Sequence, residues 1–288
     1  VGLGDLYKYE IRTAEGAVFL KTDPLAFQTE VYPRTAALIC DLPQSHRWGD
    51  DSWMARMAVT LGWELPVVIH SVTLDETASA SPERVTTYVQ LQDIVLPHLL
   101  ERSCNWVELS FWAPGETVAS YYTPNPGYGR PEELMAFINA CHQRGIGVIL
   151  GWIPPLIPRE GQELAWFDGT RIYDADVPGQ SDTLAFDLQR AEVRNILAAN
   201  AIFWQQVYHV DALCTDVRTY AARLEEGSMM AGSRFLLRET TVAPTLTTAE
   251  SDDLIQGRHA DPHAVLGPHS LSGEPGLAVV RALLLDSE

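Results

Sequence analysis

The sequence predicts an α/β protein, with part of a (β/α) barrel of the TIM type at its centre and a small β-rich segment at its amino end. Between residues 66 and 240, short β-branched runs alternate with amphipathic segments, which indicates a parallel sheet covered by helices. Residues 1–30 instead alternate polar and apolar side chains around Ala14, Glu15 and Gly16, which is typical of a β-hairpin. No glycine-rich phosphate loop follows a predicted strand, so a barrel is favoured over an open dinucleotide-binding sheet.

About five strands are expected, of the eight that close a barrel. In chain order they are VVIHSVTL, WVELSFW, GVILGWI, VDALCTDV and SRFLLRET. Helices are expected at residues 85–102, 131–143 and 189–208. The second of these has apolar residues at positions i, i+3, i+4 and i+7, with Pro131 at its start and Gly145 beyond its end, and these are typical helix boundaries.

The chain divides into four segments by composition. Residues 1–45 are expected to form the end of a β-rich module, 46–65 a polar connector, 66–245 the partial barrel, and 246–288 a Thr-rich acidic linker with a short final block. A long polar and aromatic insertion, residues 154–188, follows the third predicted strand. In a barrel it would lie on the face where active sites are built, so we expect it to shape a substrate cleft.

Composition narrows the range of partners. The 20 Lys and Arg against 38 Asp and Glu give a formal charge of -18, which repels nucleic-acid phosphates and anionic membranes. No apolar window approaches a membrane span and no targeting segment is evident, so we expect a cytoplasmic protein. Cys40, Cys104, Cys141 and Cys214 have no CxxC spacing, so neither a disulfide framework nor a metal site is expected.

Several segments, taken together and in order, resemble the glycogen branching enzymes of the α-amylase superfamily (glycoside hydrolase family 13). These segments are GDLYKYEIRTAEGAVFLKTDPLAFQTE, WGDDSWMAR, YYTPNPGYGRPEELMAFINACHQRGIGVILGWIP, FDGTRIYD, RAEVRNILAANAIFWQQVYHVDALCTDV and RETTVAP. The resemblance implies that residues 1–45 are the end of a carbohydrate-binding β-sandwich. The block GRHADPHAVLGPHS resembles the extreme amino-terminal module of these enzymes, yet it follows the barrel segment here, so 246–288 is interpreted as a displaced remnant.

The resemblance also implies which residues occupy the catalytic positions. Asp216 falls on the nucleophile, at the end of the fourth strand, but Cys214 replaces the Arg that orients it in the family. Arg238 falls on the acid/base Glu at the end of the fifth strand, leaving the neighbouring Glu239 as the acid/base candidate. Adjacent strand residues face opposite ways, so Glu239 could serve only if the backbone bulged there. An Arg cannot act as a general acid near neutral pH.

The sugar-binding positions have also changed. Gly151 and Leu156 stand where the family has an Asp and a His after the third strand. Three aromatic residues are the candidates for substrate contact: Trp166, Tyr121 and Tyr122. Trp152 and Trp204 are more simply interpreted as core residues. The histidines of the last block, His259, His263 and His269, need no metal in the module they resemble.

The sequence therefore predicts a relative of the branching enzymes that needs no cofactor and whose branching activity is weak or absent. Its expected ligand is an α-glucan such as glycogen or amylose. Alternatives are a noncatalytic protein that binds α-glucan or a partner, and an active transferase that uses Asp216 with Glu239. Because half a barrel exposes strand edges, self-association, or a partner chain that completes the barrel, is also expected.

Overall fold

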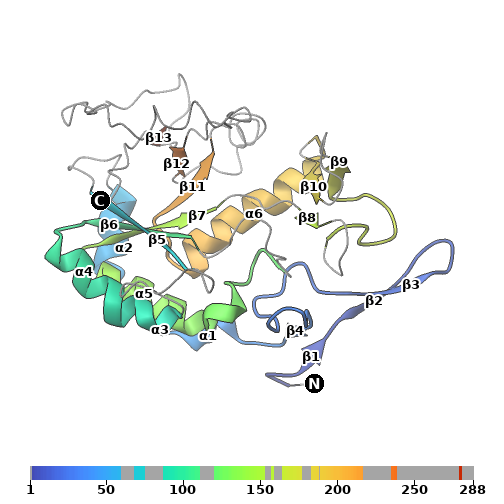
Figure 1. Cartoon of the computed structure of the whole chain (residues 1–288), viewed down its shortest axis with the longest axis horizontal. Coiled ribbons are helices and arrows are strands. Elements are labelled where there is room, and N and C mark those ends of the chain that lie inside the picture. The colour runs from blue at the N-terminus through green and yellow to red at the C-terminus, as the bar shows by residue number, and fades with distance from the viewer. Residues whose placement is uncertain are drawn as a thin grey trace, which may run out of the picture.

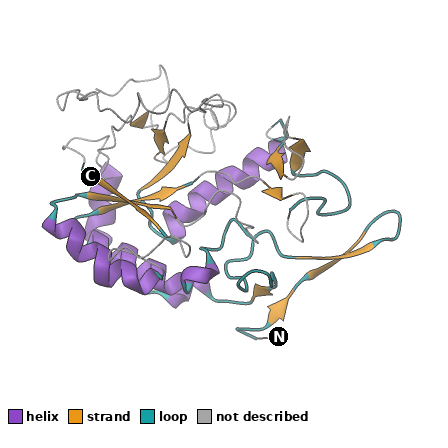
Figure 2. Ribbon diagram, viewed as in Figure 1, coloured by secondary structure: helices purple, strands orange, loops and turns teal. Residues whose placement is uncertain are grey.

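The computed structural model describes ten stretches of the chain. These are residues 2–59, 68–74, 87–110, 120–152, 157–158, 164–176, 183–187, 189–216, 235–238 and 279–280. They form a parallel sheet, with most of the helices on one side, and small antiparallel sheets at the amino end and in the insertion (Figures 1 and 2). The predicted α/β class is confirmed.

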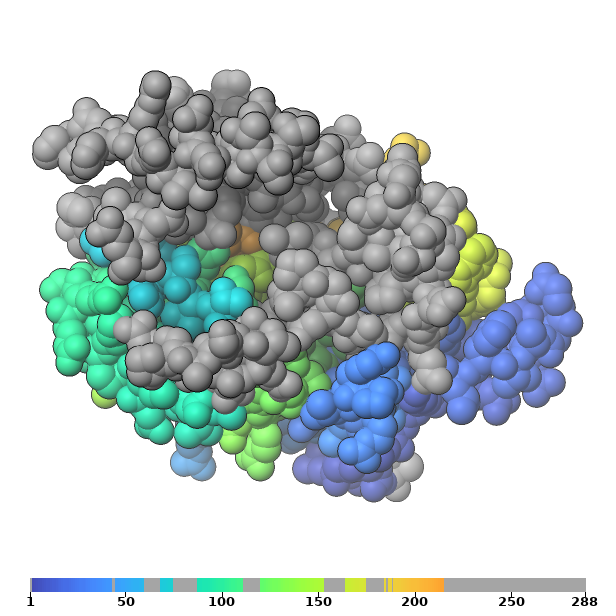
Figure 3. Space-filling model, viewed as in Figure 1, coloured from blue at the N-terminus to red at the C-terminus, as the bar shows by residue number. Residues whose placement is uncertain are grey.

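The amino-terminal segment contains the expected hairpin. Strand β2 (Tyr9–Arg12) pairs antiparallel with β3 (Val18–Lys21), and Gly16 has a φ of 89° in the turn between them, a conformation that glycine adopts without strain. A second small sheet joins β1 (Leu6–Tyr7) to β4 (Ala37–Leu38). The hairpin projects from the body of the molecule (Figure 3).

The connector is more ordered than its polar composition indicates. It holds a nine-residue helix, α2 (Asp51–Val59), and a short helix, α1 (Leu42–Ser45), directly precedes it. The first turn of α2 is closed by the amide of Met54, which donates to the carbonyl oxygen of Asp50 at 3.0 Å. Trp53 is the buried residue of this helix.

The parallel sheet has the strand order β13-β12-β11-β7-β6-β5. The strands are β5 (Ile69–Thr73), β6 (Trp106–Ser110), β7 (Gly147–Gly151), β11 (Ala212–Asp216), β12 (Phe235–Arg238) and β13 (Val279–Val280). The first five are neighbours in chain order, as successive strands of a (β/α) barrel are. The two residues of β13 come from the final block of the chain and pair with β12.

The two faces of the sheet bury different sets of side chains, because successive strand residues point to opposite faces. Toward the helices, the main core includes Val107, Leu109, Val148, Leu150 and Leu213. The opposite face carries a smaller apolar cluster made of Trp106, Ile149, Ala212 and Cys214, with Met57 and Ile69 packed against it. In a closed barrel this second face would be the interior.

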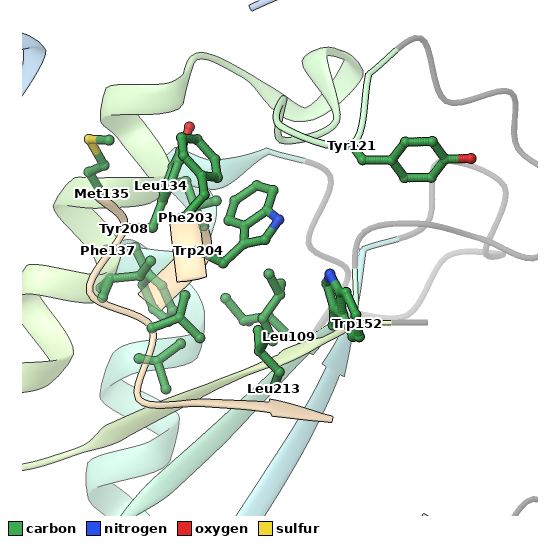
Figure 4. Close-up of a cluster of buried hydrophobic side chains, with 14 of the residues drawn as sticks. Leu109, Tyr121, Leu134, Met135, Phe137, Trp152, Phe203, Trp204, Tyr208 and Leu213 are labelled. Carbon is green, nitrogen blue, oxygen red and sulfur yellow. The ribbon is translucent and has the colours of Figure 1, made fainter. Parts of the chain in front are cut away.

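Two predicted helices are confirmed almost to the residue. They are α5 (Pro131–His142) and α6 (Ala191–Val207). Their apolar sides meet the sheet in the main core, where Trp204 and Phe137 are fully buried and Leu109 and Leu213 face them from the strands (Figure 4).

The helix expected at 85–102 is not a uniform α-helix. It consists of α3 (Tyr88–Gln90), a π-helical turn at Leu91–Val95, and α4 (Leu96–Glu101). The amide of Leu96 donates to Leu91, five residues earlier, and the next residue is Pro97, which has no N–H to continue an α-helical pattern. The proline therefore explains the local widening that the sequence periodicity did not predict.

The insertion after β7 forms a small antiparallel sheet. Its strands are β8 (Ile157–Pro158), β9 (Asp174–Asp176) and β10 (Thr183–Phe186), with β10 in the middle. Near Trp166 the insertion contacts the amino-terminal hairpin, because the buried Lys21 ammonium donates to the carbonyl oxygen of Ala165 at 2.8 Å. A short 3₁₀ turn, Pro126–Tyr128, precedes α5.

Candidate functional site

The carboxyl edge of the parallel sheet brings together two of the predicted catalytic positions. Asp216 is the last residue of β11, and its register partner is Arg238, the last residue of β12. Register partners on neighbouring parallel strands share one face of a sheet. Arg238 is therefore in register with the residue that the sequence predicts as the nucleophile. Glu239 and Leu156, which were also singled out, lie outside the described residues.

The glycine at the end of β7 is closely packed. A Cβ atom at Gly151 would lie 2.7 Å from Oγ of Ser110 and 3.3 Å from the carbonyl oxygen of Leu109. Ser110 ends the neighbouring strand β6, so its side chain fills the space beside this glycine. An aspartate at this position could enter only if Ser110 moved.

Cys214 is suited to the apolar surroundings in which it lies. It is 4% exposed, pairs in register with Gly151 and Leu236, and belongs to the smaller apolar cluster. A reduced thiol behaves there as a small hydrophobic group. It supplies no charge to a carboxylate two residues further along the strand.

A chain of two hydrogen bonds holds the residue that directly follows β7. Nε1 of Trp152 donates to Oδ1 of Asn200 at 2.8 Å, and Nδ2 of Asn200 donates to the carbonyl oxygen of Tyr121 at 2.7 Å. Trp152 and Asn200 are both buried. The side chain of Asn200, on α6, thus fixes two loops at this edge, and the interpretation of Trp152 and Trp204 as core residues is confirmed.

The three aromatic candidates lie in different environments. Tyr121 and Tyr122 are buried: the first packs edge-on against Phe186, and the hydroxyl of the second donates to Ile196 at 3.2 Å. In Figure 4 the ring of Tyr121 points away from Trp204, at the margin of the core. Trp166 is 38% exposed. The guanidinium of Arg171 lies 4.8 Å from the centre of its ring, at a distance typical of a cation–π contact.

A second group of polar residues, absent from the sequence-based candidates, lies at the opposite, amino end of the sheet. The imidazole of His142, the last residue of α5, is held between two carboxylates. Its Nδ1 is 2.8 Å from Oδ2 of Asp50, and its Nε2 is 3.0 Å from Oδ2 of Asp211. Asp211, which directly precedes β11, also accepts from Nε1 of Trp53 at 2.7 Å and from the amide of Val148 at 2.8 Å. We call His142, Asp50, Asp211 and Trp53 the amino-end cluster.

Aromatic rings enclose the amino-end cluster. Trp53 stacks on His142 with 5.2 Å between ring centres and 12° between ring planes. On the other side, Nδ1 of His209 lies 2.9 Å from Oδ2 of Asp50, and Trp48 stacks on His209 at 3.9 Å. The side chains of His142 and both aspartates are at most 1% exposed, so the cluster is shielded from water.

The geometry assigns a positive charge to His142. Both oxygens of Asp211 accept hydrogen bonds, one from the Trp53 indole and one from the Val148 amide, so the carboxyl group presents an acceptor to Nε2 of His142. Burial alone would lower the pKa of His142, but the hydrogen bonds and charges of Asp211 and Asp50 outweigh it and raise this pKa. Burial likewise would raise the pKa of Asp50, but His142 and His209 lower it. The two ring nitrogens of His142 therefore both donate.

No local sequence pattern leads to this cluster. His142 is separated from Asp50 by 92 residues and from Asp211 by 69 residues. The sequence contains one indication of a buried polar site: two polar residues adjoin apolar segments. They are His142, at the end of its helix, and Asp211, directly before the apolar residues of β11. Within the described part of the chain, no group of three His, Cys, Asp or Glu residues is placed to hold a metal ion.

The arrangement of strands and helices defines a class of fold shared with α-amylase-type enzymes. A putative alpha amylase from Salmonella typhimurium matches with a TM-score of 0.59 and 18% identity, over 83% of this chain and 41% of that one. A pullulanase from Anoxybacillus sp. LM18-11 matches with a TM-score of 0.57 and 15% identity, over 82% of this chain and 41% of that one. The described sheet is thus consistent with part of the barrel of this superfamily.

Sequence similarity relates the chain to one group of proteins within this class of fold. The 1,4-alpha-glucan branching enzyme GlgB of Gloeobacter violaceus is 37% identical over 232 residues, which are 75% of this chain and 31% of the relative. GlgB of Thermosynechococcus vestitus is 34% identical over 264 residues, covering 79% of this chain and 34% of the relative. The chain is therefore homologous to part of GlgB, as the sequence predicted, and spans about a third of the length of these curated relatives. No protein-family model matches it.

One further finding concerns membranes. Among the helices in the described stretches, none combines the length and apolar character needed to cross a bilayer.

Proposed function

We propose that this chain is a 1,4-α-glucan branching-enzyme-like protein of α-glucan metabolism whose branching activity is impaired or lost. The observation that supports the proposal is the register pairing of Asp216 with Arg238, the two residues that the resemblance assigns to the nucleophile and acid/base positions. The homology to GlgB supplies the reaction class.

The physical argument rests on the two carboxylates of retaining glycoside chemistry. One attacks the anomeric carbon, and the other, about 5 to 5.5 Å away, first donates a proton to the leaving oxygen and later accepts one from the incoming hydroxyl. An arginine remains protonated at neutral pH and cannot donate in this way. Cys214, buried in an apolar cluster, also cannot orient Asp216 by a charge-assisted hydrogen bond.

The direct test is an assay for new α-1,6 linkages in amylose, read out after debranching. We expect the wild-type chain and the Asp216→Asn variant to form equally few branches, while Gloeobacter violaceus GlgB, run in parallel, forms many. If the wild type branched amylose and Asp216→Asn did not, the proposal of lost activity would fail. Loss of that same activity in Glu239→Gln would then identify Glu239 as the acid/base.

A second candidate function is binding of α-glucan without catalysis. Two observations favour it: pullulanases of the same fold have been solved in complexes with maltotetraose and maltohexaose, and Trp166 offers a partly exposed indole ring in the insertion. Exposed aromatic rings stack well on apolar faces of ligands. The tyrosine pair, Tyr121 and Tyr122, is a weaker candidate for this contact because both residues are packed in the core.

The binding function makes its own prediction. In native gels cast with glycogen, we expect the wild type and Asp216→Asn to be retarded equally and Trp166→Ala to be retarded less, because the variant loses the stacking surface. Exposed Leu100 provides the matched control: Leu100→Ala removes an exposed apolar side chain from α4 and should leave retardation unchanged. Equal mobility of the wild type with and without glycogen would exclude this function.

A further inference from the structure

We propose that the amino-end cluster is a proton-operated clamp that holds helix α2 against the amino end of the parallel sheet. This inference goes beyond the proposed glucan function and does not depend on it. It concerns how the connector, and with it the amino-terminal segment, is fastened to the barrel.

The attachment of α2 is concentrated in a few contacts. Trp53 is the buried residue of the helix. Its indole N–H donates a hydrogen bond to Asp211, and its ring stacks on the imidazole of His142. Asp50, whose carbonyl closes the first turn of α2, reaches His142 with its carboxylate. Met57, partly buried, adds an apolar contact with the second face of the sheet. Two of these contacts, the carboxylate of Asp50 and the ring of Trp53, meet at the imidazole of His142.

The clamp needs both ring protons of His142. A neutral imidazole donates from one nitrogen only, and its other nitrogen would turn a lone pair toward a buried carboxylate oxygen. A buried acceptor that loses its donor is costly, because water does not reach it. Loss of the second proton therefore removes the hydrogen bond from His142 to Asp50 or to Asp211, and this weakens the attachment of α2 to the sheet.

The other groups around the cluster do not supply the same link. Of the two carboxylates, His209 is hydrogen-bonded to that of Asp50, and His46, whose pKa is lowered by burial, lies beside Trp48. Cys141, next to His142 on α5, has a pKa raised by burial and stays protonated. The guanidinium of Arg56 lies 4.4 Å from the centre of the Trp53 ring and contacts neither carboxylate through it. Among the described residues, His142 is the one that joins both carboxylates.

The direction of the pH response follows from the two shifted pKa values. Because the pKa of His142 is raised in the folded state, its stabilisation is complete below the unfolded value of about 6.5 and is lost as the pH rises through the folded value. Because the pKa of Asp50 is lowered, its contribution is present above its unfolded value and is lost as the pH falls through the folded value. The clamp is thus closed at mildly acidic pH and opens on the alkaline side.

Hydrogen exchange measured by mass spectrometry tests the clamp in the wild-type chain. Exchange of peptides covering α2 is followed from about pH 5 to about pH 9 and corrected for the intrinsic rate, with α4 as the reference. Between the unfolded pKa of about 6.5 and the raised folded pKa of His142, we expect the opening of α2 to increase by up to about tenfold per pH unit, since one proton is released on opening, and to level off at higher pH, while α4 does not follow. An α2 that shows no such dependence, or an α4 that follows it in parallel, would overturn the clamp.

Asp50→Asn is the sharpest variant because it removes the charge and retains the shape. Oδ1 of Asp50 is buried and has no hydrogen-bond partner among the described residues, so the amide nitrogen can take its place. The amide oxygen then keeps the bonds from His142 and His209. With one negative charge fewer beside the imidazolium, we expect the midpoint to move to lower pH.

His209→Gln is the matched control, since it removes the other histidine on Asp50 but leaves His142 between its carboxylates. We expect it to retain the steep pH dependence of the wild type. His142→Gln should instead raise the hydrogen exchange of α2 at all pH values. An unchanged midpoint in Asp50→Asn, or a response that disappears in His209→Gln, would overturn the assignment to His142, whether or not His142→Gln folds.

Discussion

Replacing Asp211 by alanine is expected to lower the free energy of unfolding by about 3 to 5 kcal/mol, the loss typical when one partner of a buried ion pair is removed. The variant leaves three donors without their acceptor: the His142 imidazolium, the Trp53 indole and the Val148 amide. All three are buried, so water cannot replace the carboxylate. Urea unfolding followed by circular dichroism gives the measurement.

The control for this prediction is an exposed carboxylate. Glu15 lies in the turn of the amino-terminal hairpin, so Glu15→Ala should change the free energy of unfolding by no more than about 0.5 kcal/mol. If Asp211→Ala lost no more than this control, the amino-end cluster would make no net contribution to stability.

Replacing Phe137 by alanine is expected to cost about 3 to 5 kcal/mol in the free energy of unfolding. Phe137 lies on α5, is fully buried, and packs between that helix and the sheet in the main core (Figure 4). The truncation removes apolar area and leaves a cavity that close-packed neighbours fill only in part. The midpoint of urea unfolding should fall at an unchanged slope.

Phe137→Leu separates the cavity from other effects. Leucine keeps much of the buried volume, so the loss should be clearly smaller than for alanine. Equal losses in the two variants would indicate that the aromatic ring, rather than the filled volume, matters at this position.

The parts of the fold that local sequence fixes were predicted well. Helix α5 has an apolar stripe with Pro131 at its start and a glycine beyond its end, and its predicted and observed bounds differ by one residue. The hairpin also followed from the alternation of side chains, and the existence of the first five parallel strands from their apolar runs, while their order in the sheet followed from the expected barrel. These features depend on neighbours in the chain, which a sequence displays directly.

The features that were missed depend on tertiary contacts. Residues 51–59 were expected to belong to a polar connector because of their composition, and the contacts of α2, among them the hydrogen bond of Trp53 to Asp211, are with residues elsewhere in the chain. The π turn before Pro97 reflects a missing amide in an otherwise regular helix. The amino-end cluster joins residues up to 92 apart, so no spacing rule could find it.

The carboxyl edge of the parallel sheet, where the candidate catalytic residues lie, was predicted only in part. The positions of Asp216 and Arg238 followed from the resemblance, and their pairing across two strands is a register that the sequence alone does not specify. The burial of Tyr121 and Tyr122 depends on partners in β10 and α6, which the sequence does not place beside them.

The contact between Gly151 and Ser110 has a consequence for substitutions at these two positions. A Cβ atom at 151 would lie 2.7 Å from Oγ of Ser110, so a side chain at this position requires the serine hydroxyl to rotate away. A smaller residue at 110 would remove that requirement. The two positions are therefore coupled, and the residue at 110 sets how readily an acidic side chain is accepted at the end of β7.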